Sequence, residues 1–63
     1  MTKEDAIFAM KTGKTVRHEL FTDDESITMV GNMIIDESGY HFDPNLFWRD
    51  RTGIEWDTGW SII

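Results

Sequence analysis

Three serines and two histidines are the residues of this 63-residue chain that could support nucleophilic catalysis. A serine nucleophile needs a base within hydrogen-bond reach, and a third group usually orients that base. The spacing of these residues does not indicate that any such pair meets; they are Ser26, Ser38, Ser61, His18 and His41. The glycines form no phosphate-binding pattern either. The sequence therefore predicts a protein that is not an enzyme, with no catalytic residue and no cofactor.

Two short acidic segments, Asp23-Asp24-Glu25 and Asp36-Glu37, are the next candidates. Carboxylates from two turns could bind calcium or magnesium, but neither segment alternates its ligands around a central glycine as an EF-hand loop does. We therefore expect no metal site here. Two other interpretations remain open: the segments contact a basic patch on a partner protein, or they keep a small protein in solution.

The two histidines could also be considered as zinc ligands. A zinc site needs further ligands, which the sequence does not identify. His18 shares its side of a predicted strand with Val16 and Leu20, which favours a packed histidine with one hydrogen bond.

The three tryptophans all lie in the last seventeen residues, next to two arginines. We expect Trp60 to belong to the core. Trp56 stands between two acidic residues in a predicted loop, where a large aromatic side chain is often partly exposed. An exposed tryptophan could be a hot spot for a partner protein or could stack on a ligand. The candidate ligand-binding residues are Arg17, Trp48, Arg49 and Trp56, and Trp56 is also a candidate for partner binding.

The charge of the chain restricts its partners. Twelve acidic and six basic residues give a formal net charge of −6 at pH 7, and no lysine or arginine occurs between His18 and Trp48. Nucleic-acid binding depends on positive charge that neutralises phosphates. Direct binding to DNA or RNA is therefore not expected, whereas an acidic surface suits a basic partner protein.

The first half of the chain predicts one helix and two strands. Thr2 is a good N-cap, Gly13 a good C-terminal cap, and apolar residues recur between them at helical spacing. This predicts a helix over residues 3–12. Residues 15–20 alternate like a half-buried strand, the acidic residues 23–25 predict a turn, and residues 26–30 predict a second strand with Ile27 and Met29 on one face.

The second half predicts a hairpin, a short helix and a last strand. Gly31-Asn32 suits a type II′ turn, which leads to a strand over residues 33–36 and, after another turn, to a short strand over 40–42. Asp43-Pro44 predicts the start of a helix over 44–51, with Trp48 and Arg51 on the side away from Phe47. Residues 54–58 read as a loop and 59–63 as the last strand.

These elements predict one small α+β domain over residues 1–63, with an N-terminal helix, an antiparallel sheet of four to five short strands, and a short helix before the last strand. A domain of this size has a thin core, and no cysteine is available for a disulfide. Self-association would add buried surface, so we expect a homo-oligomer. No stretch predicts a membrane span, and we expect a cytoplasmic protein.

A resemblance adds to this interpretation. Residues 2–7 (TKEDAI), 10–17 (MKTGKTVR), 21–27 (FTDDESI), 47–48 (FW) and 59–62 (GWSI) resemble small phage-encoded accessory proteins. The general layout is similar to the second type of Thoeris anti-defence proteins, which are oligomers that sequester a cyclic ADP-ribose-type immune signal. The present chain is shorter, lacks their longer central segment and has an acidic surface. Under this resemblance, Lys14, Arg17, Arg49 and Arg51 would supply the positive charge at a subunit interface.

Together, the residues and the resemblance favour a phage accessory protein in the host cell cytoplasm. It would inhibit a bacterial host or defence protein by direct binding through its acidic surface. The alternative is an oligomeric sponge for a nucleotide-derived signal. A structural role in the virion is a third possibility.

Overall fold

The computed structural model describes all 63 residues, and the chain begins with helix α1, Lys3–Lys11. Thr2 and Asp5 form a capping box: Asp5 N–H donates to Thr2 Oγ1 at 3.1 Å, and Thr2 N–H donates to Asp5 Oδ2 at 3.2 Å. After the helix, Gly13 has a φ of +90°, a left-handed conformation that favours glycine. The predicted helix and its caps are confirmed.

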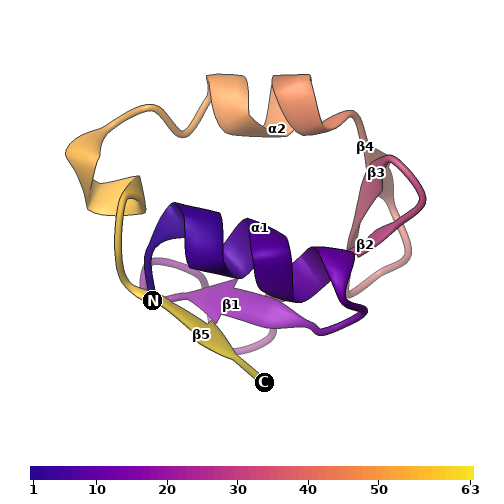
Figure 1. The fold of residues 1–63 in the computed structure, drawn as a ribbon, viewed down its shortest axis with the longest axis horizontal. Helices are drawn as coiled ribbons and strands as arrows, with labels where there is room; N and C mark the ends of the chain where they lie inside the picture. The colour runs from indigo at the N-terminus through magenta and orange to yellow at the C-terminus, as the bar shows by residue number, and fades with distance from the viewer.

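Five antiparallel strands form one sheet in the order β4-β3-β2-β1-β5 (Figure 1). The last strand of the chain pairs with the first, where His18 lies opposite Trp60. This pairing brings the two ends of the chain together in the sheet. The strands are β1 Val16–His18, β2 Ile27–Val30, β3 Met33–Asp36, β4 His41–Phe42 and β5 Trp60–Ile62.

The turn between β2 and β3 matches the type II′ prediction. Gly31 has a φ of +61°, and no residue other than glycine has a positive φ, so Asn32 does not adopt the left-handed conformation of a type I′ turn. The turn sets the register of the hairpin, in which Ile27 pairs with Asp36 and Val30 with Met33.

Helix α2, Pro44–Arg49, begins where the Asp-Pro pair predicts. Asp43 Oδ1 accepts a hydrogen bond from Asn45 N–H at 2.8 Å, and proline occupies the first helical position. The helix is shorter than predicted, because the chain leaves the helical path at Asp50. A short 3₁₀ helix, η1, Ile54–Trp56, then leads to β5.

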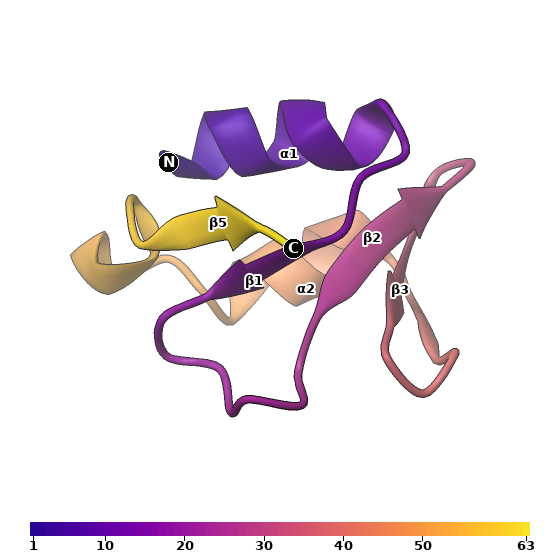
Figure 2. The ribbon, with the colours of Figure 1, turned by 90° about the horizontal axis from the view of Figure 1, so that it is seen from below.

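Both helices contribute to a core on one face of the sheet. Helix α1 packs on β1, β2 and β5, whereas α2 packs on β3 (Figures 1 and 2). Side chains alternate along a strand, so buried Val16 and His18 point toward the helices and Arg17 points to the other face. The buried apolar residues are Ala6, Ala9, Met10, Val16, Phe21, Ile27, Ile34, Phe47 and Trp60.

The predicted α+β class and order of elements are confirmed, but some details differ. Leu20 does not extend the buried face of β1 and is 58% exposed. Phe21 N–H donates to the His18 carbonyl at 2.9 Å and so turns the chain out of the strand. Tyr40 is exposed outside β4, and the predicted loop 54–58 contains η1. No helix has the length and apolar character needed to cross a membrane.

Candidate functional site

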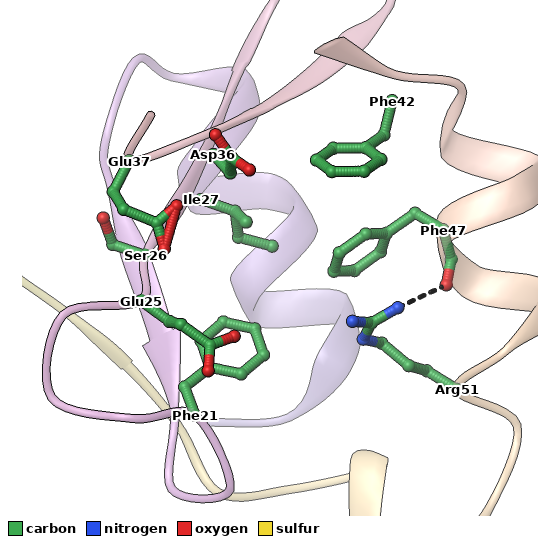
Figure 3. A pocket seen from close by; sticks show the side chains of 9 residues that line it. All are labelled: Phe21, Glu25, Ser26, Ile27, Asp36, Glu37, Phe42, Phe47 and Arg51. Carbon is green, nitrogen blue, oxygen red and sulfur yellow. Dashed lines mark hydrogen bonds between the residues drawn. The ribbon is translucent and has the colours of Figure 1, made fainter. Parts of the chain in front are cut away.

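The two acidic segments border the same cavity, which we call the acidic pocket (Figure 3). Its volume is about 80 Å³. The antiparallel pair Ile27–Asp36 explains why the segments meet: the residues before Ile27 lie beside the residues after Asp36. The lining residues are Phe21, Glu25, Ser26, Ile27, Asp36, Glu37, Phe42, Phe47 and Arg51.

The carboxylates of the two acidic segments differ in how many hydrogen bonds they accept within the protein. Asp36 Oδ1 accepts hydrogen bonds from Ser38 N–H at 2.8 Å and Tyr40 N–H at 3.0 Å, which orders the β3–β4 turn. Glu25 Oε1 accepts one from Thr22 N–H at 3.0 Å.

The other three carboxylates of these segments accept no hydrogen bond within the protein. Asp23 lies 3.6 Å from Arg17 in an exposed ion pair, which contributes little to stability. Asp24 and Glu37 are exposed, and neither side chain makes a hydrogen bond or an ion pair in the protein. These two side chains are therefore the ones most available to another molecule.

Aromatic rings and one arginine form the opposite wall of the pocket. The ring centroids of Phe42 and Phe47 are 6.2 Å apart, and the Arg51 guanidinium lies 4.0 Å from the Phe47 ring centroid. Arg51 Nη1 donates to the Phe47 carbonyl oxygen at 3.1 Å (Figure 3), while its Nε is buried without a partner. The same guanidinium is 5.3 Å from the Trp56 ring centroid.

This position of Arg51 corrects the prediction that it faces away from Phe47. The prediction extended α2 to residue 51, but the helix ends at Arg49, and the chain beyond it returns Arg51 toward the Phe47 ring. Arg51 is the only cation that lines the pocket, against three carboxylates. The pocket therefore presents net negative charge above an aromatic wall.

No group of three or more histidine, cysteine, aspartate or glutamate side chains in the protein is close enough to hold a metal ion. The carboxylates at the pocket therefore share a rim without forming a coordination site. Their arrangement suits several separate contacts with a basic surface.

His18 is buried among aromatic rings, and we call these residues the His18 cluster: His18, Phe21, Trp56 and Trp60. The imidazole centroid is 4.4 Å from the Trp56 ring and 4.8 Å from the Trp60 ring. Its Nε2 lies 2.7 Å from the Thr58 carbonyl oxygen, and its Nδ1 accepts from Leu20 N–H at 3.0 Å. Since a carbonyl only accepts, the geometry assigns the proton to Nε2.

The histidine is therefore fixed by two hydrogen bonds, one more than the sequence predicted. It makes no hydrogen bond to a serine. His41 is exposed in β4, at the sheet edge opposite β5. The arrangement gives His18 a structural role.

The structure does not gather the four predicted ligand-binding residues into one site within the protein. Trp48 and Trp56 lie 5.5 Å and 6.1 Å from the Trp60 ring, on the helix-covered side of the sheet. Arg17 is on the other face, and exposed Arg49 lies 3.8 Å from Asp50. A ligand that contacts all four would need more than one copy of the chain.

A second depression, which the sequence did not predict, separates the two helices. We call it the interhelical groove; its volume is about 470 Å³. Ile7 and Lys11 face it from α1, four residues apart, as do Pro44 and Trp48 from α2. This spacing is visible in the sequence, but the pairing of the two faces depends on the fold. The lining residues are Ile7, Lys11, Met29, Asn32, Asp43, Pro44, Asn45 and Trp48.

Comparison with known proteins adds no relative. No protein-family model, curated protein or solved structure matches this chain. A functional assignment therefore depends on the chemistry of the acidic pocket and the interhelical groove.

Proposed function

We propose that this chain is a binding protein without enzymatic activity that inhibits a bacterial host or defence factor by direct contact. The observation that carries the proposal is that two acidic segments, separate in the sequence, border one aromatic pocket. The surface they form would bind a basic surface of the partner protein.

Charge complementarity supports this choice of partner. Asp24 and Glu37 have no partner within the protein, and the net charge of −6 adds a long-range attraction for a basic surface. Such complementarity raises the association rate and selects among partners. Part of the affinity would come from the aromatic wall, where the hydrocarbon part of a lysine or arginine side chain can pack on Phe42.

The other residues at the site would act as supports. Asp36 orders the turn that presents Glu37. Arg51 links the pocket wall to half-buried Trp56, the predicted partner-binding tryptophan. The resemblance to phage accessory proteins suggests that the partner is a host or defence protein in the bacterial cytoplasm.

The test uses the tagged chain as bait in phage-infected or defence-expressing cells, followed by native mass spectrometry of the purified complex. We expect a host protein at fixed stoichiometry. The double variant Asp24→Asn/Glu37→Gln should lose most of that protein without losing its own fold, because both side chains are free of internal bonds. Raising the salt concentration should weaken the same complex.

A matched control removes two negative charges elsewhere. Glu4→Gln/Glu19→Gln changes two exposed carboxylates outside the acidic segments and should retain the partner. Equal retention by both double variants would overturn the proposal. An oligomer that carries a retained small molecule, with no host protein, would favour the sponge instead.

A further inference from the structure

The positive charges of this acidic protein are distributed unevenly. The two ion pairs of the structure use Arg17 and Arg49, so none of the three lysines is paired with a carboxylate. Two of these lysines, Lys3 and Lys11, belong to α1, and Lys14 follows that helix. The three unpaired lysines therefore gather near the N-terminus, away from the acidic segments in the sequence.

One lysine lines the interhelical groove, and a second lies next to a residue of its lining. Lys11 lines it, and Lys3 Nζ is 4.6 Å from the ring centroid of Trp48, which also lines it. Asp43 is the only acidic residue of the lining, and its carboxylate already accepts the capping hydrogen bond from Asn45 N–H. The groove lining thus balances one cation against one carboxylate, whereas the acidic pocket has one cation against three carboxylates.

The rest of the lining combines apolar surface with free polar groups. Ile7, Met29 and Trp48 are half-buried hydrophobic residues that pack against the core, so each leaves part of its surface toward the groove. The side-chain amides of Asn32 and Asn45 make no hydrogen bond within the protein. Ligand sites commonly have an apolar lining with a few such polar groups, and volumes of roughly 300–1,000 Å³.

We propose that the interhelical groove binds a small amphipathic anion, with an apolar or aromatic body and one acidic group. The body would lie over Ile7, Met29 and Trp48, and the acidic group would pair with Lys11, near the free amides. The volume of about 470 Å³ suits a ligand of this size rather than a single ion.

The charges of the lining residues explain why the ligand would be an anion and why it would bind in this groove. The acidic pocket repels anions with three carboxylates, whereas the groove offers an unpaired ammonium group beside apolar surface. An ion pair beside a partly desolvated surface is stronger than one in open water. This inference does not depend on the proposed contact with a basic protein, since the two sites have no lining residue in common.

The test compares two probes that share a ring system. One is 8-anilinonaphthalene-1-sulfonate, an aromatic anion, and the other is N-phenyl-1-naphthylamine, which lacks the sulfonate. Titrations of the ¹⁵N-labelled protein followed by NMR should give saturable shifts of the Trp48 indole N–H and the Asn32 and Asn45 amides with the anionic probe. The neutral probe should bind at least about tenfold more weakly, the factor expected for roughly 1.4 kcal/mol.

Two lysine variants make the test specific. Lys11→Gln should weaken the anionic probe about tenfold and leave the neutral probe unchanged. Lys14→Gln removes the same charge outside the groove lining and should leave both affinities near the original values. Both lysines are exposed, so the fold should be retained, which the NMR spectrum of each variant shows directly.

Three results would overturn the inference: no saturable shifts at the groove, equal binding of the two probes, or equal weakening by the two lysine variants. Shifts at Ser26 and Glu37 instead of the groove would place the probe in the acidic pocket and would also contradict it.

Discussion

The His18 cluster and the acidic pocket both combine aromatic rings with ionisable side chains, but they use them in opposite ways. In the cluster, both imidazole nitrogens are hydrogen-bonded, and Trp60 Nε1–H donates to the Trp56 carbonyl oxygen at 2.8 Å. In the pocket, Glu37 has no partner and Arg51 Nε is buried without one. Satisfied polar groups stabilise a core, whereas unsatisfied ones remain available for binding or reduce stability.

The two regions also differ in how the chain assembles them. The cluster joins residues that are far apart in the sequence, through the pairing of β1 with β5. The acidic pocket depends mainly on the local β2–β3 hairpin and on α2, although Phe21 of the cluster also lines it. We therefore expect changes in the cluster to affect the whole fold, and changes at the pocket rim to affect binding alone.

The largest effect should follow Trp60→Ala. Trp60 is 2% exposed and contacts the rings of His18, Phe21, Trp48 and Trp56. Truncating a buried tryptophan costs about 3–5 kcal/mol, which would unfold much of a domain this small. Urea denaturation followed by circular dichroism measures the loss. Trp56→Ala, at a half-buried position, should lower the unfolding free energy by less. Equal losses for the two variants would contradict the prediction that Trp60 contributes more to the core.

A smaller but still large effect should follow His18→Leu. Leucine fills part of the space but leaves the Thr58 carbonyl and the Leu20 N–H without their partners. Both hydrogen bonds are part-buried, and each typically contributes roughly 0.5–1.5 kcal/mol, so we expect a total loss of about 1–3 kcal/mol. His41→Leu, at an exposed position, serves as the control and should change the unfolding free energy little. A His18→Leu protein as stable as the original would contradict the structural role of His18.

The sequence predicted the elements whose limits are set by local chemistry. The Thr2 and Asp43 caps, the Gly31 turn and Pro44 all act within a few residues, and the structure has each helix or turn where they indicate. The patterns also placed Trp60 in the core, because a large aromatic side chain within an apolar segment of a small domain usually lies in its core.

The ends of elements without a strong capping signal, and the features that depend on distant contacts, were predicted poorly. Leu20 continued an alternating pattern, but the hydrogen bond from Phe21 N–H to the His18 carbonyl ends the strand before it. Arg51 was assigned to the wrong side because the end of α2 could not be located from a sequence without a clear C-cap. The interhelical groove requires two helices on one sheet face, which no local pattern specifies.

An intermediate effect should follow Arg51→Met, which tests the boundary between the two regions. Methionine can keep apolar contact with Phe47 and Trp56, but it cannot donate to the Phe47 carbonyl oxygen. We expect a loss of about 1 kcal/mol in unfolding free energy, the typical value of one hydrogen bond. The pocket also becomes more negative, so a basic partner should bind more tightly. Weaker binding would show that Arg51 itself contacts the partner.

The smallest effect on stability should follow Asp24→Asn/Glu37→Gln, the same variant that should lose the partner protein. Neither side chain has an internal bond, and removing two charges from a protein of net charge −6 reduces self-repulsion. Differential scanning calorimetry should give a Tm within about 3 °C of the original protein. Asp36→Ala is the matched contrast, because it removes the acceptor of two turn hydrogen bonds and should lower the Tm further. If this double variant lost as much stability as Asp36→Ala, Asp24 and Glu37 would support the fold, and the distinction between the packed cluster and the open pocket would fail.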